Sequence, residues 1–403
     1  MSALSAAEQY EILIENVAEI ITEDEFKKKL EKRVAENKPL RCKLGIDPSA
    51  PDLHLGHAVV LHKLRQFQEL GHHIIIILGD FTGMIGDPTG RSEMRKQLSV
   101  DEVMANAKTY QEQIFNILDA DKTEMVFNSE WLAKLNFADV IKLASTLTVA
   151  RMMEREDFGK RYQDNVAIGI HEFFYPLMQG YDSIAIDADI EFGATEQKFN
   201  LLMGRHLQRE YGHEPQVAFT MPILVGTDGV QKMSKSLGNY VGITETPDQI
   251  YGKIMSISDD LMGEYYRLAT SLPGDEVSSI LTQVESNDMH PRDAKMRLAR
   301  EIVSLYHDNS KAEEAEQQFQ QVFQKKEMPS EMNAFNYKAP AWIVNVMVDS
   351  GLAPSKSEAR RLIQQNGVKI DGETVSSIDL ELTDKKEQII QVGKRKFARV
   401  NIL

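Results

Sequence analysis

The run HHIIIILGD, residues 72–80, constrains the fold more than any other stretch of the chain. It is continuously apolar and rich in β-branched residues, which is typical of a strand buried on both faces of a parallel sheet. The segment RCKLGID, residues 41–47, reads as a short strand that ends before a proline. Between the two, residues 57–70 carry apolar side chains at helical spacing. This order predicts a βαβ unit and a doubly wound parallel sheet.

Further strands of this sheet are expected at residues 124–128, 183–190 and 216–220. The fold class is therefore α/β, with a Rossmann-like domain first. An α-helical domain and a small α+β domain are expected to follow. The predicted division is the Rossmann-like domain at 1–225 with a helical insertion at about 130–170, a lysine-containing loop at 226–245, the helical domain at 246–325, a linker at 326–340 and the small domain at 341–403.

The composition of the chain restricts the cellular compartment and the kinds of partner that we expect. The chain has 403 residues, a net charge of −15 and one cysteine, so an internal disulfide and a cysteine-rich zinc site are excluded. The N-terminal stretch lacks the basic start and apolar run of a signal peptide, and no apolar run approaches the ~20 residues that span a bilayer. We therefore expect a cytoplasmic protein without a membrane partner. The acidic total gives no general attraction to nucleic acid, although local basic patches could still bind RNA.

The last segment differs in charge from the rest. Residues 340–403 hold 10 Lys and Arg against 8 Asp and Glu. SKSEARRLIQQNG, residues 355–367, predicts a helix with a capping box at its start and Gly367 as its stop. Asp371-Gly372 then predicts a hairpin turn. The helix would leave three basic side chains largely outward: Lys356, Arg360 and Arg361.

The stretch DPSAPDLHLGHA, residues 47–58, holds His54 and His57 with Gly56 between them. A helical metal pair has its ligands four residues apart around a glutamate, whereas here the spacing is three and no third ligand is near. A capping or packed pair of histidines is one interpretation. The pair also lies where a strand ends and a helix begins, and the free N–H groups of a helix start favour phosphate.

Two further stretches carry cations that suit phosphate. VQKMSKSLGN, residues 230–239, contains Lys232, Ser234 and Lys235. GDPTGRSEMR, residues 86–95, contains Arg91 and Arg95, and the guanidinium fork matches phosphate oxygens. A solvated basic loop and surface ion pairs would explain these residues equally well.

HEFFYPLMQGYDS, residues 171–183, carries a polar stripe. Tyr175, Gln179 and Asp182 recur at i, i+4 and i+7, so they share one face of a helix whose other side chains are largely apolar. A solvent-facing side of the helix is the simple interpretation. A binding surface for a small polar ligand is the alternative.

HLGH followed by KMSKS on one α/β chain resembles the paired motifs of class I aminoacyl-tRNA synthetases. The resemblance implies that His54, His57, Lys232 and Lys235 stabilise the charge that develops when an amino acid's carboxylate attacks the α-phosphate of ATP. Such an attack needs positioning and charge neutralisation and no general base. Mg²⁺ would bind through the nucleotide, without a dedicated protein metal site. The implied contacts of ATP and pyrophosphate are Gly56, Arg91, Arg95, Glu196 and Ser234.

The polar stripe resembles the tyrosine pocket of tyrosyl-tRNA synthetases. There, Asp182 would accept a hydrogen bond from the phenol, and the ammonium group would lie near three other side chains. The implied tyrosine-binding residues are Asp47, Asp87, Tyr175, Gln179, Asp182 and Gln197. The sequence departs from many members at Glu196, where they carry aspartate, and at Lys43, near a position where many bacterial members carry tyrosine.

The C-terminal segment resembles an RNA-binding module named after small-subunit ribosomal protein four, which closes many bacterial tyrosyl-tRNA synthetases. The resemblance implies a ligase that joins L-tyrosine to tRNA-Tyr with ATP, a homodimer with residues 130–170 at the interface, and no DNA partner. A tryptophanyl-tRNA synthetase and a nucleotidyltransferase without tRNA remain alternatives, as does a non-catalytic RNA-binding protein.

Overall fold

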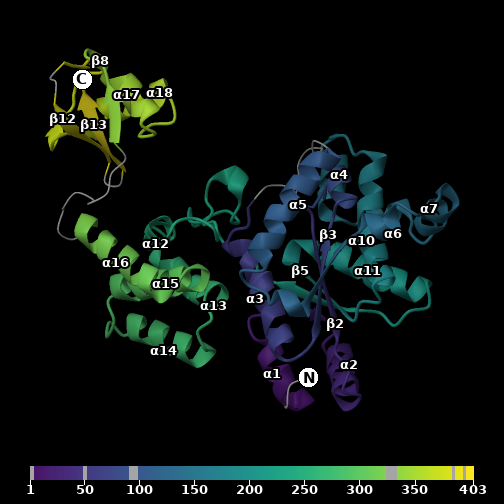
Figure 1. The fold of residues 1–403 in the computed structure, drawn as a ribbon. Coiled ribbons are helices and arrows are strands. Elements are labelled where there is room, and N and C mark those ends of the chain that lie inside the picture. The colour runs from purple at the N-terminus through teal and green to yellow at the C-terminus, as the bar shows by residue number, and fades with distance from the viewer. Residues whose placement is uncertain (1–3, 49–51, 90–98, 324–333, 384–385, 394–395) are drawn as a thin grey trace. The chain divides into compact units, whose positions relative to one another are not determined.

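The computed structural model describes residues 4–48, 52–89, 99–323, 334–383, 386–393 and 396–403 (Figure 1). The chain divides into two compact units, Met1–Ala312 and Glu313–Leu403. Within the described ranges, no helix combines the length and the apolar character that crossing a membrane requires.

A six-stranded sheet forms the centre of the first unit, in the order β1-β6-β5-β2-β3-β4. Strands β2 to β6 are parallel to one another, and β1 pairs antiparallel with β6 at one edge. The chain winds outward from β2 toward β4 and, on the other side, from β5 toward β6, so the switch point of the sheet lies between β2 and β5. The strands are β1 Glu19–Ile21, β2 Arg41–Ile46, β3 His73–Leu78, β4 Thr123–Phe127, β5 Ile190–Ala194 and β6 Val217–Met221.

Four of the expected strands are confirmed, and the one expected at residues 183–190 is wrong. Helix α10, Phe174–Ala185, continues through the start of that segment, and β5 begins only at Ile190. The helix ends in a turn in which Asp187 has a φ of 48°. The reason is close helix packing, because a Cβ on Gly180 would lie 2.7 Å from Leu207 Cδ1 of α11.

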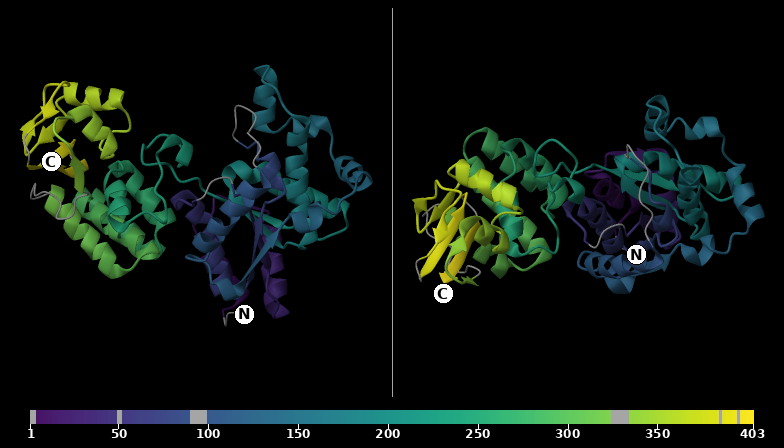
Figure 2. Two further views of the ribbon diagram at one scale, coloured as in Figure 1. Left: turned by 45° about the horizontal axis from the view of Figure 1, so that its top comes forward. Right: turned by 90° about the horizontal axis from the view of Figure 1, so that it is seen from above.

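Helices cover both faces of the sheet, with α3 on one side and α10 and α11 on the other (Figures 1 and 2). The flanking helices are α1 Ala6–Ile14, α2 Glu23–Ala35, α3 Leu55–Glu69, α4 Thr82–Ile85, α5 Val100–Ile114, α10 Phe174–Ala185 and α11 Lys198–Glu210. The 3-10 turns are η1 Ala120–Lys122, η2 Ile170–Phe173, η3 Thr195–Gln197, η4 Lys235–Leu237 and η5 Asp259–Leu261.

Helices also occupy the two other stretches in which the sequence predicts them. Those between β4 and α10 are α6 Ser129–Leu132, α7 Phe137–Ala144, α8 Val149–Met152 and α9 Glu156–Gln163. Those after the sheet are α12 Pro247–Met255, α13 Met262–Ala269, α14 Gly274–Glu285, α15 Pro291–Tyr306 and α16 Asn309–Phe323.

The second unit is a small α+β fold with a five-stranded sheet in the order β10-β9-β12-β13-β7 and a separate pair, β11-β8. Its core packs around fully buried side chains such as Ile343 and Ile363. The elements are β7 Ala334–Tyr337, β8 Ala341–Trp342, α17 Ile343–Asp349, α18 Lys356–Gln364, β9 Val368–Ile370, β10 Glu373–Thr374, β11 Glu381–Leu382, β12 Glu387–Val392 and β13 Lys396–Ile402.

The predicted helix and hairpin of this unit are confirmed. The Ser355 hydroxyl caps α18 by accepting from the main-chain N–H of Glu358 at 3.3 Å. Asp371 and Gly372 have φ values of 49° and 91°, which is the geometry of a tight hairpin turn. The predicted helix stop is corrected, because Asn366, with a φ of 55°, takes the left-handed position that the sequence assigns to Gly367.

Candidate active site

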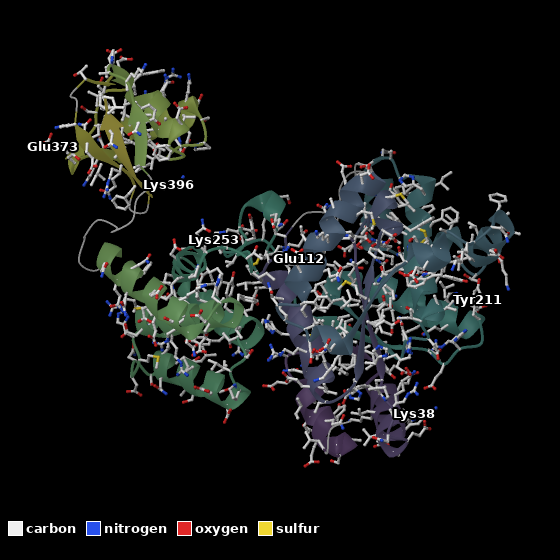
Figure 3. The ribbon with its side chains drawn as sticks, in the orientation of Figure 1. Lys38, Glu112, Tyr211, Lys253, Glu373 and Lys396 are labelled. Carbon is white, nitrogen blue, oxygen red and sulfur yellow. The ribbon has the colours of Figure 1, made fainter. Side chains whose placement is uncertain are left out.

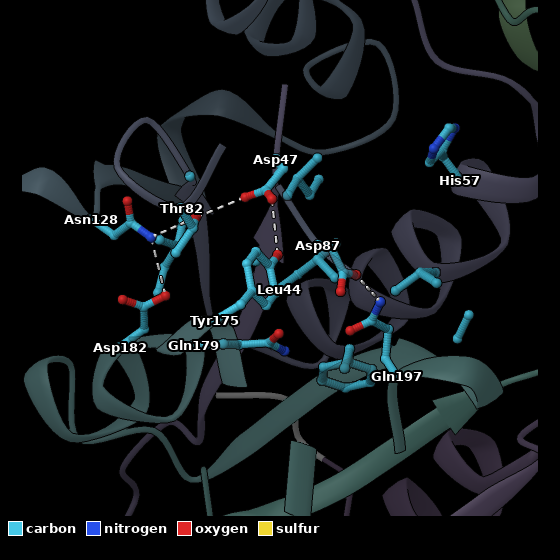
Figure 4. Close-up of a pocket in the computed structure, with 18 of the residues that line it drawn as sticks. Leu44, Asp47, His57, Thr82, Asp87, Asn128, Tyr175, Gln179, Asp182 and Gln197 are labelled. Atoms are coloured by element: carbon cyan, nitrogen blue, oxygen red, sulfur yellow. Dashed lines mark hydrogen bonds between the residues drawn. The ribbon is translucent and has the colours of Figure 1, made fainter. Parts of the chain in front are cut away.

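A cavity of about 270 Å³ opens at the switch point, beyond the carboxyl ends of β2 and β5 (Figure 4). Ligands bind at this position in open α/β sheets, and the volume is close to the lower end of the range for small-molecule sites, about 300–1,000 Å³. Its walls are mixed: apolar Leu44, Ile46, Val60, Ile77 and Phe192 face polar Asp47, His57, Thr82, Asp87, Asn128, Tyr175, Gln179, Asp182 and Gln197. Such a cavity suits a small molecule with an apolar body and polar ends.

The two histidines stand at the start of α3, which begins at Leu55, two residues before its predicted start. The main-chain N–H of Gly56 donates to Nδ1 of His54 at 3.2 Å, and the main-chain N–H of His54 donates to Nδ1 of His57 at 3.3 Å. Because a main-chain N–H only donates, both Nδ1 atoms are unprotonated, and each neutral ring carries its proton on Nε2. The pair therefore caps the helix and keeps an N–H donor on each ring.

Burial keeps both rings neutral. It is the largest cause that lowers the pKa of His54 to about 2, with the His57 and Lys235 charges adding to it. Burial and then Lys235 lower the pKa of His57 to about 4. At neutral pH, the histidines are hydrogen-bond donors without charge.

Asp47 follows the end of β2 and is held by two hydroxyl groups. Tyr175 donates to its Oδ2 at 2.9 Å, and Thr82 donates to its Oδ1 at 2.8 Å (Figure 4). Burial, and after it the Asp47 charge, raises the pKa of Tyr175 well above its ordinary value. The Tyr175 hydroxyl thus stays protonated and donates to Asp47.

Asp182 lines the cavity from α10 and is 3% exposed. Trp131 Nε1 donates to its Oδ1 at 2.8 Å, and Asn128 Nδ2 lies 3.4 Å from its Oδ2. Burial raises the pKa of Asp182 to about 7, although Lys43 and these two donors act in the lowering direction. A buried carboxyl with this pKa can accept a further hydrogen bond from a ligand hydroxyl group.

On another part of the wall, Asp87 joins two segments. Gln197 Nε2 donates to its Oδ2 at 2.6 Å, and the Thr89 hydroxyl donates to its Oδ1 at 2.6 Å. Arg155, between α8 and α9, donates from Nη2 to the Thr89 hydroxyl at 2.6 Å and lies 3.6 Å from Asp87 Oδ1. The helical segment between β4 and α10 thus reaches this wall of the cavity.

The lysines of the 230–239 stretch are each held by a carboxylate. Lys232 Nζ lies 2.8 Å from both oxygens of Glu196, and Lys235 Nζ lies 2.9 Å from Oδ2 of Asp52. All four side chains are partly exposed, between 22% and 50%. The main-chain N–H of Ser234 donates to Asn239 Oδ1 at 2.8 Å. The lysines are therefore ordered, but by pairs that are weak in water.

This stretch is joined to the histidine segment by main-chain pairing. Leu55 N donates to Val241 O at 3.0 Å, and Ile243 N donates to Leu53 O at 3.2 Å. Lys253 of α12, labelled in Figure 3, donates to the main-chain oxygen of Tyr240 at 2.9 Å. Segments almost two hundred residues apart in the sequence are thereby brought together, as the motif pair predicts.

The fold brings most of the expected site residues together. Eight of them line one cavity: Asp47, Gly56, His57, Asp87, Tyr175, Gln179, Asp182 and Gln197. His54 stacks on His57 with 3.9 Å between ring centroids, and Lys235 is near enough to lower the pKa of both rings. Arg91 and Arg95 lie outside the described residues.

The three basic residues of the second unit lie on α18. Lys356 and Arg360 approach the ring of Trp342, at 6.0 and 5.2 Å from its centroid. Arg361 instead pairs with Glu358 at 2.6 Å. The unit thus presents an aromatic ring with two cations over it.

Sequence reasoning missed several side chains that complete the cavity. Trp131, Asn128, Thr82 and Arg155 all hold a carboxylate or hydroxyl group of the site. Trp131 carried one weak signal, since it is one of two tryptophans in the chain and follows a predicted strand closely. The others lie in no recognisable pattern.

Comparisons with known proteins agree with this geometry. A family model described as tRNA synthetases class I (W and Y) matches residues 35–324, and a model of the tyrosine--tRNA ligase SYY-like C-terminal domain matches residues 318–400. The tyrosine--tRNA ligase of Moorella thermoacetica is 61% identical over 396 residues, which is 98% of this chain and 96% of that protein. That of Carboxydothermus hydrogenoformans is 58% identical and covers 97% of both chains.

A solved structure shares the fold. The tyrosyl-tRNA synthetase complexed with L-tyrosine from Archaeoglobus fulgidus aligns with a TM-score of 0.63 at 23% identity, over 77% of this chain and all of that one. The family models and the near full-length relatives cover both the sheet-containing unit and the C-terminal unit. The chain belongs to the class I tRNA synthetases of the tryptophan and tyrosine group and, within it, to the tyrosine--tRNA ligases.

Proposed function

We propose that the cavity at the switch point is where this tyrosine--tRNA ligase binds L-tyrosine and activates it with ATP. The observation that carries the assignment is Asp182, a buried acceptor at the cavity wall with two fixed donors and room for a third. A phenol hydroxyl fits that place. Phenylalanine would leave the buried acceptor without its partner, and tyrosyl-tRNA synthetases reject phenylalanine for this reason by roughly 10⁵-fold.

The other end of the amino acid would meet a second polar group. Tyr175, Gln179 and Asp87 line the cavity, and each offers an oxygen acceptor that suits an ammonium ion. Asp47 would hold Tyr175 in place, and Gln197 would contact the carboxylate or the adenylate. The apolar walls, such as Leu44 and Phe192, would cover the aromatic ring.

In the first step, a carboxylate oxygen of tyrosine attacks the α-phosphorus of ATP. A new P–O bond forms, the bond to the β-phosphate oxygen breaks, and pyrophosphate leaves with that electron pair. The Nε2–H groups of His54 and His57 would stabilise the developing charge by hydrogen bonds, and the ammonium groups of Lys232 and Lys235 would neutralise it. In the second step, a hydroxyl of the terminal adenosine of tRNA-Tyr attacks the tyrosyl carbonyl, and AMP leaves.

The lysines must change partners for this step. Their pairs with Glu196 and Asp52 are partly exposed, so phosphate oxygens can replace the carboxylates at small cost. Glu196, once released, would be available to the ribose of ATP, and Gly56 and Ser234 would approach its phosphates. Arg91 and Arg95 are proposed to face the pyrophosphate.

Mg²⁺ would supply further charge neutralisation on the phosphates. Among the described residues, no group of three or more His, Cys, Asp or Glu side chains is arranged to hold a metal ion. We propose that the ion is carried mainly by the nucleotide, because Mg²⁺ keeps several waters and typically binds substrate phosphates with one or two carboxylates.

The test is pyrophosphate exchange into ATP with each of the twenty amino acids. Tyrosine should support exchange, and tryptophan should not; the reverse preference would overturn the assignment. Lys235→Ala should slow exchange by on the order of 10²–10³. Lys38→Ala, at an exposed lysine that pairs with nearby Glu36, is the matched control and should exchange at the full rate.

We further propose a homodimer formed through the segment between β4 and α10. This segment exposes several large apolar side chains, with Phe137 at 80% and Ile170 at 77%, and clustered exposure of this kind marks protein interfaces. Phe137→Glu with Ile170→Glu should therefore halve the mass measured by sedimentation. Met104→Glu, at an exposed residue of α5, should leave the mass unchanged.

The basic face of α18 with Trp342 is proposed to contact the tRNA backbone through Lys356, Arg360 and Arg361. Residues 246–325 would form a separate helical domain on the anticodon side. The reaction is proposed to take place in the cytoplasm.

A further inference from the structure

A buried ion pair lies between the sheet and α10. Lys43 of β2 and Glu191 of β5 are directly opposite each other in the parallel register, so their side chains leave the sheet on the same face. Lys43 Nζ lies 2.9 Å from Glu191 Oε1, and both side chains are 0% exposed. Neither Lys43 nor Glu191 is among the described residues that line the cavity.

The pair holds Gln179 at both ends. Lys43 Nζ donates to its main-chain oxygen at 2.8 Å, and Gln179 Nε2 donates to Glu191 Oε1 at 3.0 Å. A carboxylate only accepts hydrogen bonds, so the NH₂ group of Gln179 must face Glu191. Its amide oxygen then points the other way, and it has no hydrogen-bond partner within the described part of the chain. Gln179 lines the cavity (Figure 4).

The remaining bonds of the pair keep it fixed. The Lys43 ammonium also donates to Ser183 Oγ at 2.8 Å, so its three protons all have acceptors. Glu191 Oε2 accepts from Ser183 Oγ at 3.3 Å and from Gln216 Nε2. Gly204 of α11 leaves the space for this network, because a Cβ there would lie 3.0 Å from Glu191 Oε2.

We propose that Lys43 and Glu191 are positioning residues for amino-acid recognition, which act through Gln179 by aiming its amide oxygen at the substrate's ammonium group. The inference rests on the assignment of the cavity to L-tyrosine. An amide turned the other way would present an NH₂ group to the ammonium and repel it. Lys43, which lies near a position where many bacterial members of the family carry tyrosine, therefore has a structural role beneath the cavity.

The test removes the pair without leaving a buried charge. Lys43→Met combined with Glu191→Leu deletes both charges together, because deletion of one partner alone would strand the other in the interior. Gln179 itself is unchanged, but its amide loses the acceptor that orients it. Cys42→Ala is the control, since Cys42 is fully buried on the same strand and faces the opposite side of the sheet.

Binding of two ligands is measured by calorimetry: L-tyrosine and 3-(4-hydroxyphenyl)propanoate, which is tyrosine without its ammonium group. The double variant should lose about tenfold in affinity for L-tyrosine, the loss expected for one hydrogen bond to a charged group. Its affinity for the propanoate should stay within about twofold of the parent protein. Cys42→Ala should bind both ligands like the parent.

An equal loss of affinity for both ligands would overturn the proposal, since it would indicate general damage to the cavity. Unchanged affinity for L-tyrosine would overturn it as well. If the double variant does not fold, Lys43→Met combined with Glu191→Gln is closer in shape to the parent. In this variant, Ser183 and Gln216 donate to the amide oxygen of the new glutamine, so its NH₂ group faces Gln179. The same selective loss of affinity for L-tyrosine is therefore expected. Failure of the parent protein to bind L-tyrosine would instead refute the assignment of the cavity.

Discussion

Replacement of Asp182 by asparagine is expected to stabilise the first unit at alkaline pH while it impairs recognition of tyrosine. Burial raises the pKa of Asp182 to about 7 from the usual 3.8. The folded protein therefore retains a proton between these two pH values that the unfolded chain releases. Stability must fall as the pH rises through this window, because the folded state binds more protons than the unfolded state.

The magnitude follows from the two pKa values. Their difference is about 3 units, and one unit corresponds to about 1.4 kcal/mol, so ionised Asp182 costs up to about 4 kcal/mol of the free energy of unfolding above pH 7. Part of this cost is already present at pH 5, because the unfolded chain has released the Asp182 proton at that pH while the folded protein retains it. Between pH 5 and pH 8, the stability of the parent should fall by about 2–3 kcal/mol relative to that of Asp182→Asn.

Urea unfolding at pH 5 and pH 8 measures this difference. Trp131, which donates to Asp182, reports on the first unit by fluorescence when the second tryptophan is removed by Trp342→Phe. Tyrosine and phenylalanine are compared as substrates for pyrophosphate exchange on the same preparations. Asparagine still offers an oxygen to the indole but no longer supplies a carboxylate for the phenol, so preference for tyrosine should erode.

Parallel pH dependence of the two proteins would refute the reasoning, because it would mean that Asp182 is not the group that titrates in this window. If Asp182→Asn stabilises the protein but leaves the preference for tyrosine undiminished, Asp182 titrates as described but does not bind the phenol. The phenol of the substrate would then lie elsewhere in the cavity.

Two further predictions concern the surroundings of the cavity. Trp131→Phe removes a hydrogen bond that lowers the pKa of Asp182, so the acid limb of the pH profile of kcat/KM for tyrosine should move to higher pH; an unmoved limb would contradict this. Gly204→Ala places a Cβ 2.3 Å from Gln216 Nε2 and should destabilise the protein by about 1–3 kcal/mol in urea unfolding. Gly252→Ala, where no atom lies within 4 Å of the new Cβ, should not destabilise it.

The parallel core of the first unit was predictable mainly because one of its strands is a long apolar run. The run at 72–80 forms β3, an interior strand of the sheet, with five of its six residues buried. The segment at 183–190 alternates apolar and polar residues, and its first part is helical. Ile184 and Ile186 fit either a strand or a helix by spacing alone, and the contact of Gly180 with α11 decides between them.

Site residues that belong to short sequence patterns could be predicted, whereas those whose partners are distant in the sequence could not. His54, His57 and the stripe on α10 form patterns within a few residues, so the sequence could name them as candidates, although a capping pair and a solvent-facing stripe fitted the spacing as well. Trp131 and Arg155 reach the cavity from the helical segment between β4 and α10, and their roles depend on a partner fixed by the fold.

Lys43 shows why one strand residue could not be interpreted from the sequence. Its position in β2 indicates only a buried lysine, which would be costly without a partner. The partner, Glu191, lies almost 150 residues later in the sequence, in β5. Because β5 begins at Ile190, Glu191 belongs to the sheet and stands opposite Lys43. The parallel pairing of β2 with β5 therefore explains why a lysine can be buried at this position of the strand.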